Sequence, residues 1–382
     1  MNPLNQIPSF IIWNQNPEIF RIPLSIIGLG DRPIVWYGLL FALAFVIAQQ
    51  IMYWIFQTEG RPKADVDKLT TYMVLATVVG ARLGHCLFYD PIGYLSNPIE
   101  IIKIWEGGLA SHGGALGILI AVYIFVKKNP SYTWFWMVDR LVIVVALVGA
   151  MIRTGNLMNS EMEGIETKAN YGIVYARGTT NAIKAYSKST RRGNGLEIND
   201  ITYHKGGKLQ SDVQGWHPIT IKIEYKKGDL DTPNGRNWIE KTLANGLKRS
   251  RESYEHISLG DGLLNYDLSK EGGTQVLNIY ALGISRHASQ IYEAMYCLLL
   301  MVILLWLWKN KRSVLPPGFL FALFNILLWS LRFFDEFFKM NQESFEDNIP
   351  LNMGQWLSIP LFTMGVVIMI YIYRKKTLNQ TP

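Results

Sequence analysis

The chain consists mostly of long apolar runs joined by short polar loops, with one long polar stretch in its middle. About seven of the apolar runs are near the length of roughly 20 residues that a helix needs to cross the hydrocarbon core of a bilayer. We predict spanning helices at about 34–56, 69–89, 112–126, 134–152, 290–308, 318–334 and 356–373. This pattern is typical of a polytopic membrane protein.

The polar middle, residues 157–285, contains no apolar run long enough to span a membrane. Segments such as GIVYARG and ITIKIEYKKG alternate in the way of strands, and stretches such as RRGNG and TPNGRN separate them. The predicted fold class is therefore an all-α polytopic membrane protein of about seven transmembrane helices, with an extracytoplasmic β-rich or α+β insert between spans four and five.

Lys and Arg cluster in the loops after the first, third, fifth and seventh predicted spans. Basic loops stay in the cytoplasm, whereas long loops cross the membrane regardless of charge. We expect an extracytoplasmic N-terminal segment and insert, a cytoplasmic C-terminus, and no cleaved signal peptide. The expected domains are segment 1–33, spans one to four in 34–156, the head insert 157–285, spans five to seven in 286–376, and the tail 377–382.

The composition agrees with this prediction, since 49% of the residues are hydrophobic and only 18% are charged. The net charge of +7 lies in loops and the insert without a nucleic-acid recognition motif, so we expect a lipid bilayer and no nucleic acid as a partner. Cys86 and Cys297 lie within apolar runs, which indicates packing residues and neither a disulfide framework nor a metal cluster.

The stretch GAMIRTGNLMNSEMEG, residues 149–164, places polar side chains where the fourth apolar run ends. Arg153, Asn156 and Asn159 recur every third residue, so in a continuing helix they share a face that is able to bind an anion such as a lipid phosphate. A simple helix cap with an arginine that reaches the membrane surface explains the same residues. Both interpretations stay open at this point.

Titratable and aromatic polar residues recur at the predicted outer ends of several spans, which predicts a single site in the outer leaflet, an active site. These residues are Tyr37, Arg82, His85, His112, Arg153, Tyr292, Glu293, Arg332, Asp335 and Glu336.

Each of these residues also has a structural explanation. Arg82 would pair with Glu293 or Asp90, and Glu336 would neutralise Arg332 one turn away. His112 precedes the close-packing sequence GGALG, but it is also a well-placed group that titrates near neutral pH. Near the cytoplasmic end of span four, Asp139 and Arg140 are expected to be an anchor.

Several enzyme classes lack the residues that would carry their chemistry. The chain has no HExxH, no CxxC pair and no GxSxG, which removes zinc proteolysis and serine hydrolysis. The glycines of EGGLASHGG lack the Lys and Ser/Thr of a P-loop.

The stretch RTGNLMNSEMEG resembles the signature R-x-G-N-F-x-N-x-E-x-x-G of the prolipoprotein diacylglyceryl transferase family, with Leu157 where Phe is usual. The resemblance extends over roughly residues 20–165 and 283–376, and leaves most of the insert unexplained. Its further motifs are IVWYGLLF, GARLGHCLFYDP, GGLASHGGALG, RHASQIYEA, PPGFLFALFNILLWSLRFFDEFF and MGQWLSIP.

The resemblance implies an enzyme of the bacterial inner membrane that transfers the diacylglyceryl group of phosphatidylglycerol to the lipobox cysteine thiol of prolipoproteins. This reaction forms a thioether, releases glycerol phosphate and needs no metal or cofactor. By the same resemblance, Arg153 and Arg332 are the two essential arginines that hold the lipid head group, and His112 is the histidine of the family's HGG motif. As a hypothesis, His112 takes the thiol proton. The expected phosphatidylglycerol-binding residues are Arg153, Asn156, Glu161, Tyr37 and Gly164, which match the family's motifs, and Glu336, one turn after Arg332.

Besides Leu157, the chain departs from the family pattern in three places. Leu328 stands where a functional tyrosine is frequent, Ala288 replaces a proline, and the insert is much longer than the family's usual head domain. Leu328 leaves open an inactive homologue acting as a membrane scaffold, and the other alternative is an anion-binding secondary transporter that uses the same arginines. No internal repeat is visible and the polar cluster lies toward the outer surface, which argues against a transporter.

Overall fold

The computed structural model describes residues 9–23, 25, 30–103, 108, 110–188, 196–227, 229–341, 346 and 349–378. The chain forms two compact units, which are described separately. The helical unit consists of Tyr37–Gly155, Tyr292–Glu336 and Glu343–Pro382. The head unit consists of Met1–Trp36, Asn156–Ile291 and Phe337–Gln342.

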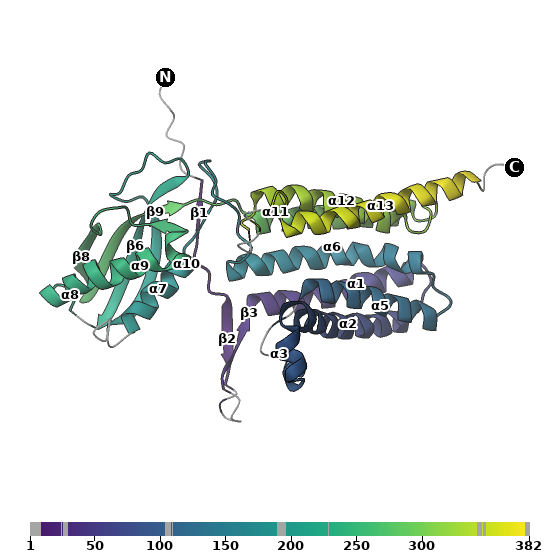
Figure 1. The fold of residues 1–382 in the computed structure, drawn as a ribbon, viewed down its shortest axis with the longest axis horizontal. Coiled ribbons are helices and arrows are strands. Elements are labelled where there is room, and N and C mark those ends of the chain that lie inside the picture. Colours follow the sequence, from purple (N-terminus) through teal and green to yellow (C-terminus); the bar gives the residue numbers. More distant parts are fainter. Residues whose placement is uncertain are drawn as a thin grey trace, which may run out of the picture. The chain divides into compact units, whose positions relative to one another are not determined.

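Seven long helices build the helical unit and lie side by side in antiparallel fashion (Figure 1). They are α1 (Trp36–Thr58), α2 (Lys63–Tyr89), α5 (Ser111–Lys128), α6 (Trp134–Asn159), α11 (Ser289–Lys311), α12 (Phe319–Asp335) and α13 (Met353–Leu378). Shorter helical segments are α3 (Pro91–Ser96), α4 (Ile99–Ile102) and η4 (Glu336–Phe338). Each of the predicted spans lies on one of the long helices.

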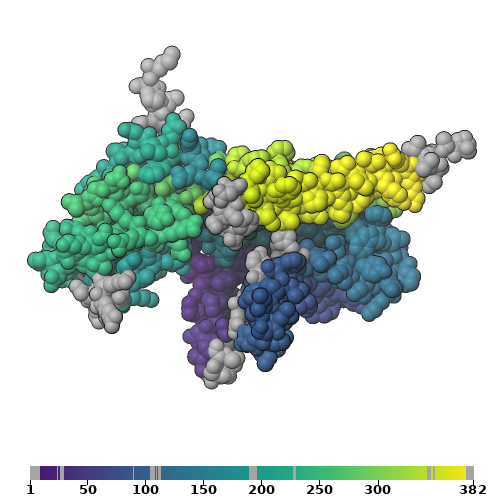
Figure 2. All heavy atoms as spheres, viewed as in Figure 1, coloured from purple at the N-terminus to yellow at the C-terminus, as the bar shows by residue number. Residues whose placement is uncertain are grey.

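Among the described residues, five helices are long and apolar enough to cross a membrane: α1, α2, α6, α11 and α13. Their most apolar windows have mean hydropathies between 1.3 and 2.1. Only 17% of that window is buried in α13, against 61% in α6, so the apolar side chains of α13 face outward (yellow in Figure 2) while α6 lies in the interior. Outward-facing apolar side chains on long helices are what a lipid environment requires, and the chain is a polytopic membrane protein.

Glycines allow α2 and α5 to approach closely. A Cβ at Gly113 would lie 2.2 Å from the Gly80 carbonyl oxygen, and one at Gly117 would lie 2.4 Å from that of Ala76. Side chains at these positions would therefore force the backbones apart. The GxxxG spacing of Gly113 and Gly117 serves the close helix contact expected of it.

Polar contacts join the end of α1, the start of α6 and the start of α12. Arg140 Nη2 on α6 binds Glu59 Oε1 at 2.9 Å, and the Glu59 carboxylate also accepts hydrogen bonds from the indoles of Trp136 and Trp308. Beside it, the Asp139 carboxylate accepts from the N–H groups of Gly318, at 2.7 Å, and Phe321, at 2.8 Å. Asp139 and Arg140 thus form an anchor, as the sequence predicts.

The head unit contains an antiparallel sheet with the strand order β5-β6-β9-β7, and β8 also pairs with β9. These strands are β5 (Glu197–Lys205), β6 (Trp216–Lys227), β7 (Ile257–Ser258), β8 (Tyr266–Glu271) and β9 (Thr274–Ile284). Ile219, Ile221 and Ile223 of β6 are fully buried, which fits the alternation read from ITIKIEYKKG.

Helices pack against this sheet and make the insert α+β (Figure 1). They are α7 (Arg177–Lys188), α8 (Pro233–Asn237), the π-helical turn η3 (Trp238–Leu243), α9 (Ala244–Arg249) and α10 (Arg251–Tyr254). The N-terminal segment joins the same unit, since β1 (Ile11–Trp13) pairs in parallel with β4 (Ile173–Tyr175). A hairpin of β2 (Glu18–Ile22) and β3 (Arg32–Val35) follows before α1.

Candidate active site

Two arginines from different helices converge on one carboxylate in the helical unit. Arg153 Nε on α6 lies 2.5 Å from Glu293 Oε2 on α11. Arg332 Nη1 on α12 lies 3.7 Å from the same oxygen, and Arg332 Nη2 lies 3.4 Å from Glu336 Oε1. Four charged side chains that are far apart in the sequence therefore form one cluster, which we call the arginine cluster.

Because the cluster is largely buried, each charged side chain needs an oppositely charged partner within it. The Glu293 side chain is 3% exposed and that of Arg153 13%, whereas that of Arg332 keeps 25% of its surface. A buried carboxylate needs charged or hydrogen-bonding partners, and two guanidinium groups supply them. Planar guanidinium groups also bind phosphate oxygens in pairs, so two of them directed at one point form a phosphate-binding arrangement.

Glu336 is held by the start of α13. Its Oε2 accepts from Asn352 Nδ2 at 3.2 Å, and a Cβ at Gly354 would lie only 2.3 Å from its Oε1. Asn352 and Gln355 exchange backbone and side-chain hydrogen bonds, which is the geometry of a capping box. This capped helix end therefore positions Glu336 beside Arg332.

Tyr37 contacts α6 two residues beyond Arg153, and Arg82 contacts backbone carbonyls. Tyr37 on α1 packs against α6, because a Cβ at Gly155 would lie 2.8 Å from Tyr37 Cδ2. Arg82 donates from Nε to the Ile101 carbonyl at 2.8 Å and from Nη1 to that of Gly108 at 3.2 Å. Arg82 thus contacts the backbone near α3 and α4, and Glu293 binds Arg153. The expected pairing of Arg82 with Glu293 or Asp90 stays a prediction.

The backbone of His112 lies in the first turn of α5, which begins at Ser111. Its side chain lies outside the described part of the chain, and so does Gly107 of the glycine-rich stretch. The role of His112 therefore stays a prediction.

The signature residues beyond Gly155 belong to the head unit. Helix α6 continues through Asn156 and ends at Asn159. Ser160 N–H donates to the Leu157 carbonyl and Glu161 N–H to that of Asn156, both at 3.0 Å, while Ser160 has a left-handed φ of 53°. This is a Schellman motif with serine in place of the usual glycine. Helix α6 therefore continues through Asn156 and Asn159, and Ser160 and Glu161 then cap it.

The segment that follows, residues 160–164, is called the signature loop here, and side chains near the start of α11 hold it. Gln290 Nε2 donates to the Glu161 carbonyl and Ser289 Oγ to that of Met162, each at 2.7 Å. A Cβ at Gly164 would lie 2.3 Å from the His287 carbonyl oxygen, so glycine is required there. The amide of Asn159 donates to the Glu161 carboxylate. The loop therefore presents Glu161 from a fixed backbone.

Sequence reasoning placed Glu293 at the depth of the site and named it only as a partner of Arg82, and it missed Asn352 and Gln355. The signal for Glu293 was the excess of arginine at that depth, because two buried cations need a counter-charge. Asn352 and Gln355 precede and open an apolar run, and the spacing N-x-x-Q is a capping pattern for a helix start.

A family model for prolipoprotein diacylglyceryl transferase matches residues 25–371. Among curated proteins, the chain is 32% identical to a phosphatidylglycerol–prolipoprotein diacylglyceryl transferase of Tolumonas auensis, over 96% of this chain and 99% of the relative. It is 30% identical to the proteins of that name from Chloroherpeton thalassium, over 98% of both chains, and Porphyromonas gingivalis, over 95% of both.

Alignments of this extent include the insert. The chain therefore matches these relatives over nearly their full length, insert included. With the family model covering nearly the whole sequence, the chain belongs to the prolipoprotein diacylglyceryl transferase family.

Proposed function

We propose that this protein transfers the diacylglyceryl group of phosphatidylglycerol to the lipobox cysteine of prolipoproteins, as the first step of lipoprotein maturation. The arginine cluster carries the proposal, because Arg153 and Arg332 stand at the family's arginine positions and converge on one point. Family membership supports the reaction type, since the relatives are named for this transfer.

In the proposed topology, α5 and α12 join the five longer helices as spans, which gives seven crossings of the inner membrane. Lys127 and Lys128 at the end of α5 and Lys309 and Lys311 at the end of α11 would face the cytoplasm. The N-terminus and the insert would then be extracytoplasmic, on the side where secreted prolipoproteins emerge.

In the proposed mechanism, Arg153 and Arg332 bind the phosphate of the lipid. The thiolate sulfur of the prolipoprotein attacks the diacylglycerol carbon that is esterified to the phosphate. A carbon–sulfur bond forms, the bond between that carbon and the phosphate oxygen breaks, and glycerol phosphate leaves. Negative charge grows on the departing phosphate oxygen, so guanidinium groups that bind it more tightly in the transition state accelerate the step.

His112 would accept the thiol proton, because the thiolate is the reactive form of cysteine. Asn156 and Glu161 would orient the head group or an arginine, Tyr37 and Gly164 would shape the lipid site, and Glu336 would keep Arg332 in place. The nucleophile belongs to the substrate, and the residues proposed here need no cofactor.

The test uses the purified full chain in detergent with phosphatidylglycerol and a lipobox peptide, and mass spectrometry detects the thioether-linked product. We expect the parent and Arg312→Ala, an exposed arginine outside the cluster, to form product. Arg153→Ala and Arg332→Ala should lose roughly 100-fold or more in rate, which is typical for removal of a group that stabilises developing negative charge. No product from a well-folded parent would favour the transporter or scaffold alternative, and solute uptake into vesicles would then separate those two.

A further inference from the structure

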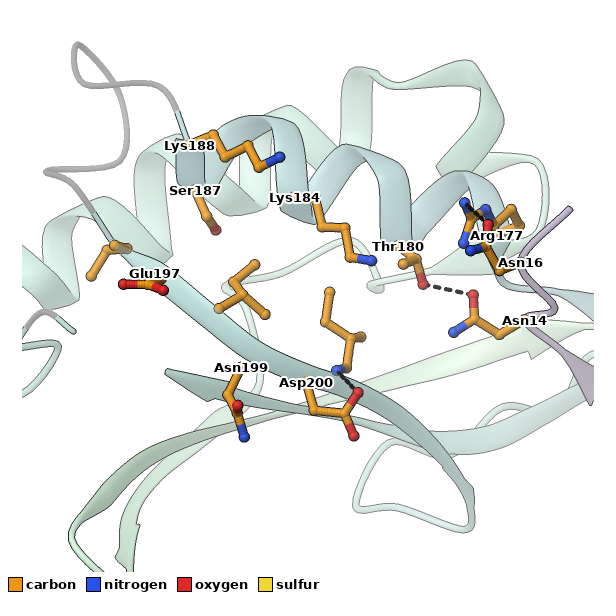
Figure 3. A pocket seen from close by; sticks show the side chains of 13 residues that line it. Asn14, Asn16, Arg177, Thr180, Lys184, Ser187, Lys188, Glu197, Asn199 and Asp200 are labelled. Carbon is orange, nitrogen blue, oxygen red and sulfur yellow. Dashed lines mark hydrogen bonds between the residues drawn. The ribbon is translucent and has the colours of Figure 1, made fainter. Parts of the chain in front are cut away.

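A groove of about 740 Å³ lies in the head unit between α7 and β5 (Figure 3). Helix α7 contributes Arg177, Lys184 and Lys188 to one wall. Asn14 and Asn16, which follow β1, close one end: Asn16 Oδ1 accepts from Arg177 at 3.0 Å, and Asn14 Oδ1 accepts from Thr180 at 2.8 Å. The proposed lipid chemistry uses none of these residues.

The second wall is the edge of a sheet. Every residue from 196 to 201 lines the groove, although successive side chains of a strand point to opposite faces. The pairing of β5 with β6 has bulges between Glu197 and Asp200, which break the alternation there, so consecutive residues line the groove. The strand order agrees, because β5 is the last strand of the sheet on this side and pairs with β6 alone among the described strands.

The edge of β5 offers backbone hydrogen-bonding groups to the groove. In an antiparallel pair, every second N–H of a strand points away from its partner. The Ile201 N–H is one of these, and the Asp200 carboxylate accepts it at 2.9 Å (Figure 3). A side chain of β5 thus occupies a position that a carbonyl of an added strand would fill.

The cations of α7 form a stripe along the groove. Arg177, Lys184 and Lys188 are spaced by seven and four residues, so they lie on one face of the helix, and both lysines are exposed. This wall is therefore complementary to carboxylate side chains.

The two walls together favour a polypeptide over a small anion. Glu197 and Asp200 lie on the β5 side, so an anion filling the groove would meet repulsion there. A peptide in extended conformation pairs its backbone with the strand and directs alternate side chains to opposite faces, which allows its acidic side chains to face α7.

We propose that this groove binds an extended, acidic polypeptide segment as an added strand on β5. If the proposed function holds, the segment belongs to the prolipoprotein, outside its lipobox. The groove then binds a segment of the prolipoprotein that is separated in sequence from the reacting cysteine.

Binding of fluorescent peptides to the full chain in detergent tests the proposal. The probes are a peptide with alternating acidic residues, its neutral amide counterpart, and the acidic peptide N-methylated at alternate residues so that backbone pairing is blocked. Lys184→Glu combined with Lys188→Glu should weaken binding of the acidic peptide about tenfold or more, whereas Asp200→Ala should strengthen it. Lys241→Glu, a charge reversal at an exposed lysine of the same unit outside the groove, is the control.

The transfer assay separates this proposal from the proposed function. With a lipobox peptide that carries an acidic tail, the double lysine variant should raise KM without changing kcat, and the rate on a short peptide without the tail should stay unchanged. Equal binding of all three peptides, or loss of binding with Lys241→Glu as well, would overturn the proposal of a peptide-binding groove. A parent that transfers no lipid but still distinguishes the three peptides would overturn the proposed transferase function and support peptide binding in the groove. Self-association that is abolished by the double lysine variant, without peptide binding, would identify a second copy as the occupant and also overturn the proposal.

Discussion

Glu293 Oε2 lies 2.5 Å from Arg153 Nε and 3.7 Å from Arg332 Nη1, so one buried carboxylate sets the spacing of two guanidinium groups from different helices. The carboxylate balances charge while it fixes the direction of the arginines. This arrangement makes Glu293 a positioning residue for the proposed reaction.

Glu293→Gln should therefore separate rate from binding. Without the negative charge the arginines are less constrained, and we expect kcat to fall about tenfold or more. The KM for phosphatidylglycerol should not rise, because no carboxylate competes with the lipid phosphate. Steady-state kinetics with varied lipid measure both constants, and Glu271→Gln on the head unit is the control. A raised KM with unchanged kcat would contradict the positioning role.

His112→Ala tests the proposed proton acceptor. Loss of a general base typically costs 10² to 10⁴ in rate, so we expect a decrease in kcat of about that size and loss of the acidic limb of the pH–rate profile. His204→Ala, at an exposed position of β5, is the matched control. Near-normal turnover of His112→Ala would remove the histidine from this role.

The glycine contact between α2 and α5 gives a prediction on stability. Gly113→Ala places a methyl group against the Gly80 backbone and should destabilise the protein by about 2 kcal/mol or more, since the backbone cannot yield easily. At the neighbouring Gly114, a Cβ would meet its nearest atom at 3.5 Å, an ordinary contact. Thermal unfolding in detergent should therefore show a lower midpoint for Gly113→Ala and little change for Gly114→Ala. Equal midpoints would show that the helices do not depend on this contact.

A buried pair in the head unit predicts a dependence of stability on pH. Burial raises the pKa of Glu163 from its usual 4.5 to about 8, and burial together with the charge of Arg286 lowers the pKa of His256 from 6.5 to about 3. The geometry agrees with a neutral His256, because Arg286 Nε donates to its Nδ1 at 3.1 Å and its Nε2 faces Glu163 Oε2 at 3.2 Å.

Between pH 4.5 and 8 the folded protein holds the Glu163 proton and the unfolded chain does not, and above pH 6.5 His256 is neutral in both states. The stability contributed by the pair should therefore fall as the pH rises from 6.5 to 8, by up to about 2 kcal/mol. Below pH 6.5 the unfolded chain protonates His256 and the folded protein does not, which offsets the contribution of Glu163 down to pH 4.5, and from there stability falls as the pH decreases toward 3. Glu163→Gln should abolish the alkaline fall in melting temperature. If Glu163→Gln and the parent have the same pH profile, Glu163 is ionised in the folded protein at neutral pH.

Much of the helical unit could be predicted from hydropathy, because an apolar run of sufficient length has few other structures available to it. The ends of the helices were harder to predict from the sequence. Helix α2 begins at Lys63, within the loop that the charges marked as polar, because a helix extends past its apolar run wherever its end is solvated. The short helices α3 and α4 have no periodic pattern long enough to detect.

The sequence predicted which residues belong to the site better than it predicted which of them contact one another. Depth in the membrane grouped Arg153, Glu293 and Arg332, but depth alone does not decide which arginine pairs with the carboxylate, so the sequence did not predict the pair of Arg153 and Glu293. In the head unit, the strands around 173–175 and 216–227 followed from alternation, whereas the parallel pairing of β1 with β4 joins residues about 160 positions apart and has no local signal. Glu163 and His256 likewise become a pair only through the fold.

The hydrogen bonds from the first turn of α12 to Asp139 have a mechanical meaning. Gly318, which donates one of them, precedes Arg332 by fourteen residues, about 21 Å along the helix axis. Since each residue of a helix advances the side-chain direction by about 100°, a slip of α12 by one residue at Asp139 would turn the arginine away from Glu293. By fixing the first turn of α12, Asp139 therefore prevents the helix from rotating about its axis and determines the direction of the Arg332 guanidinium group at the other end.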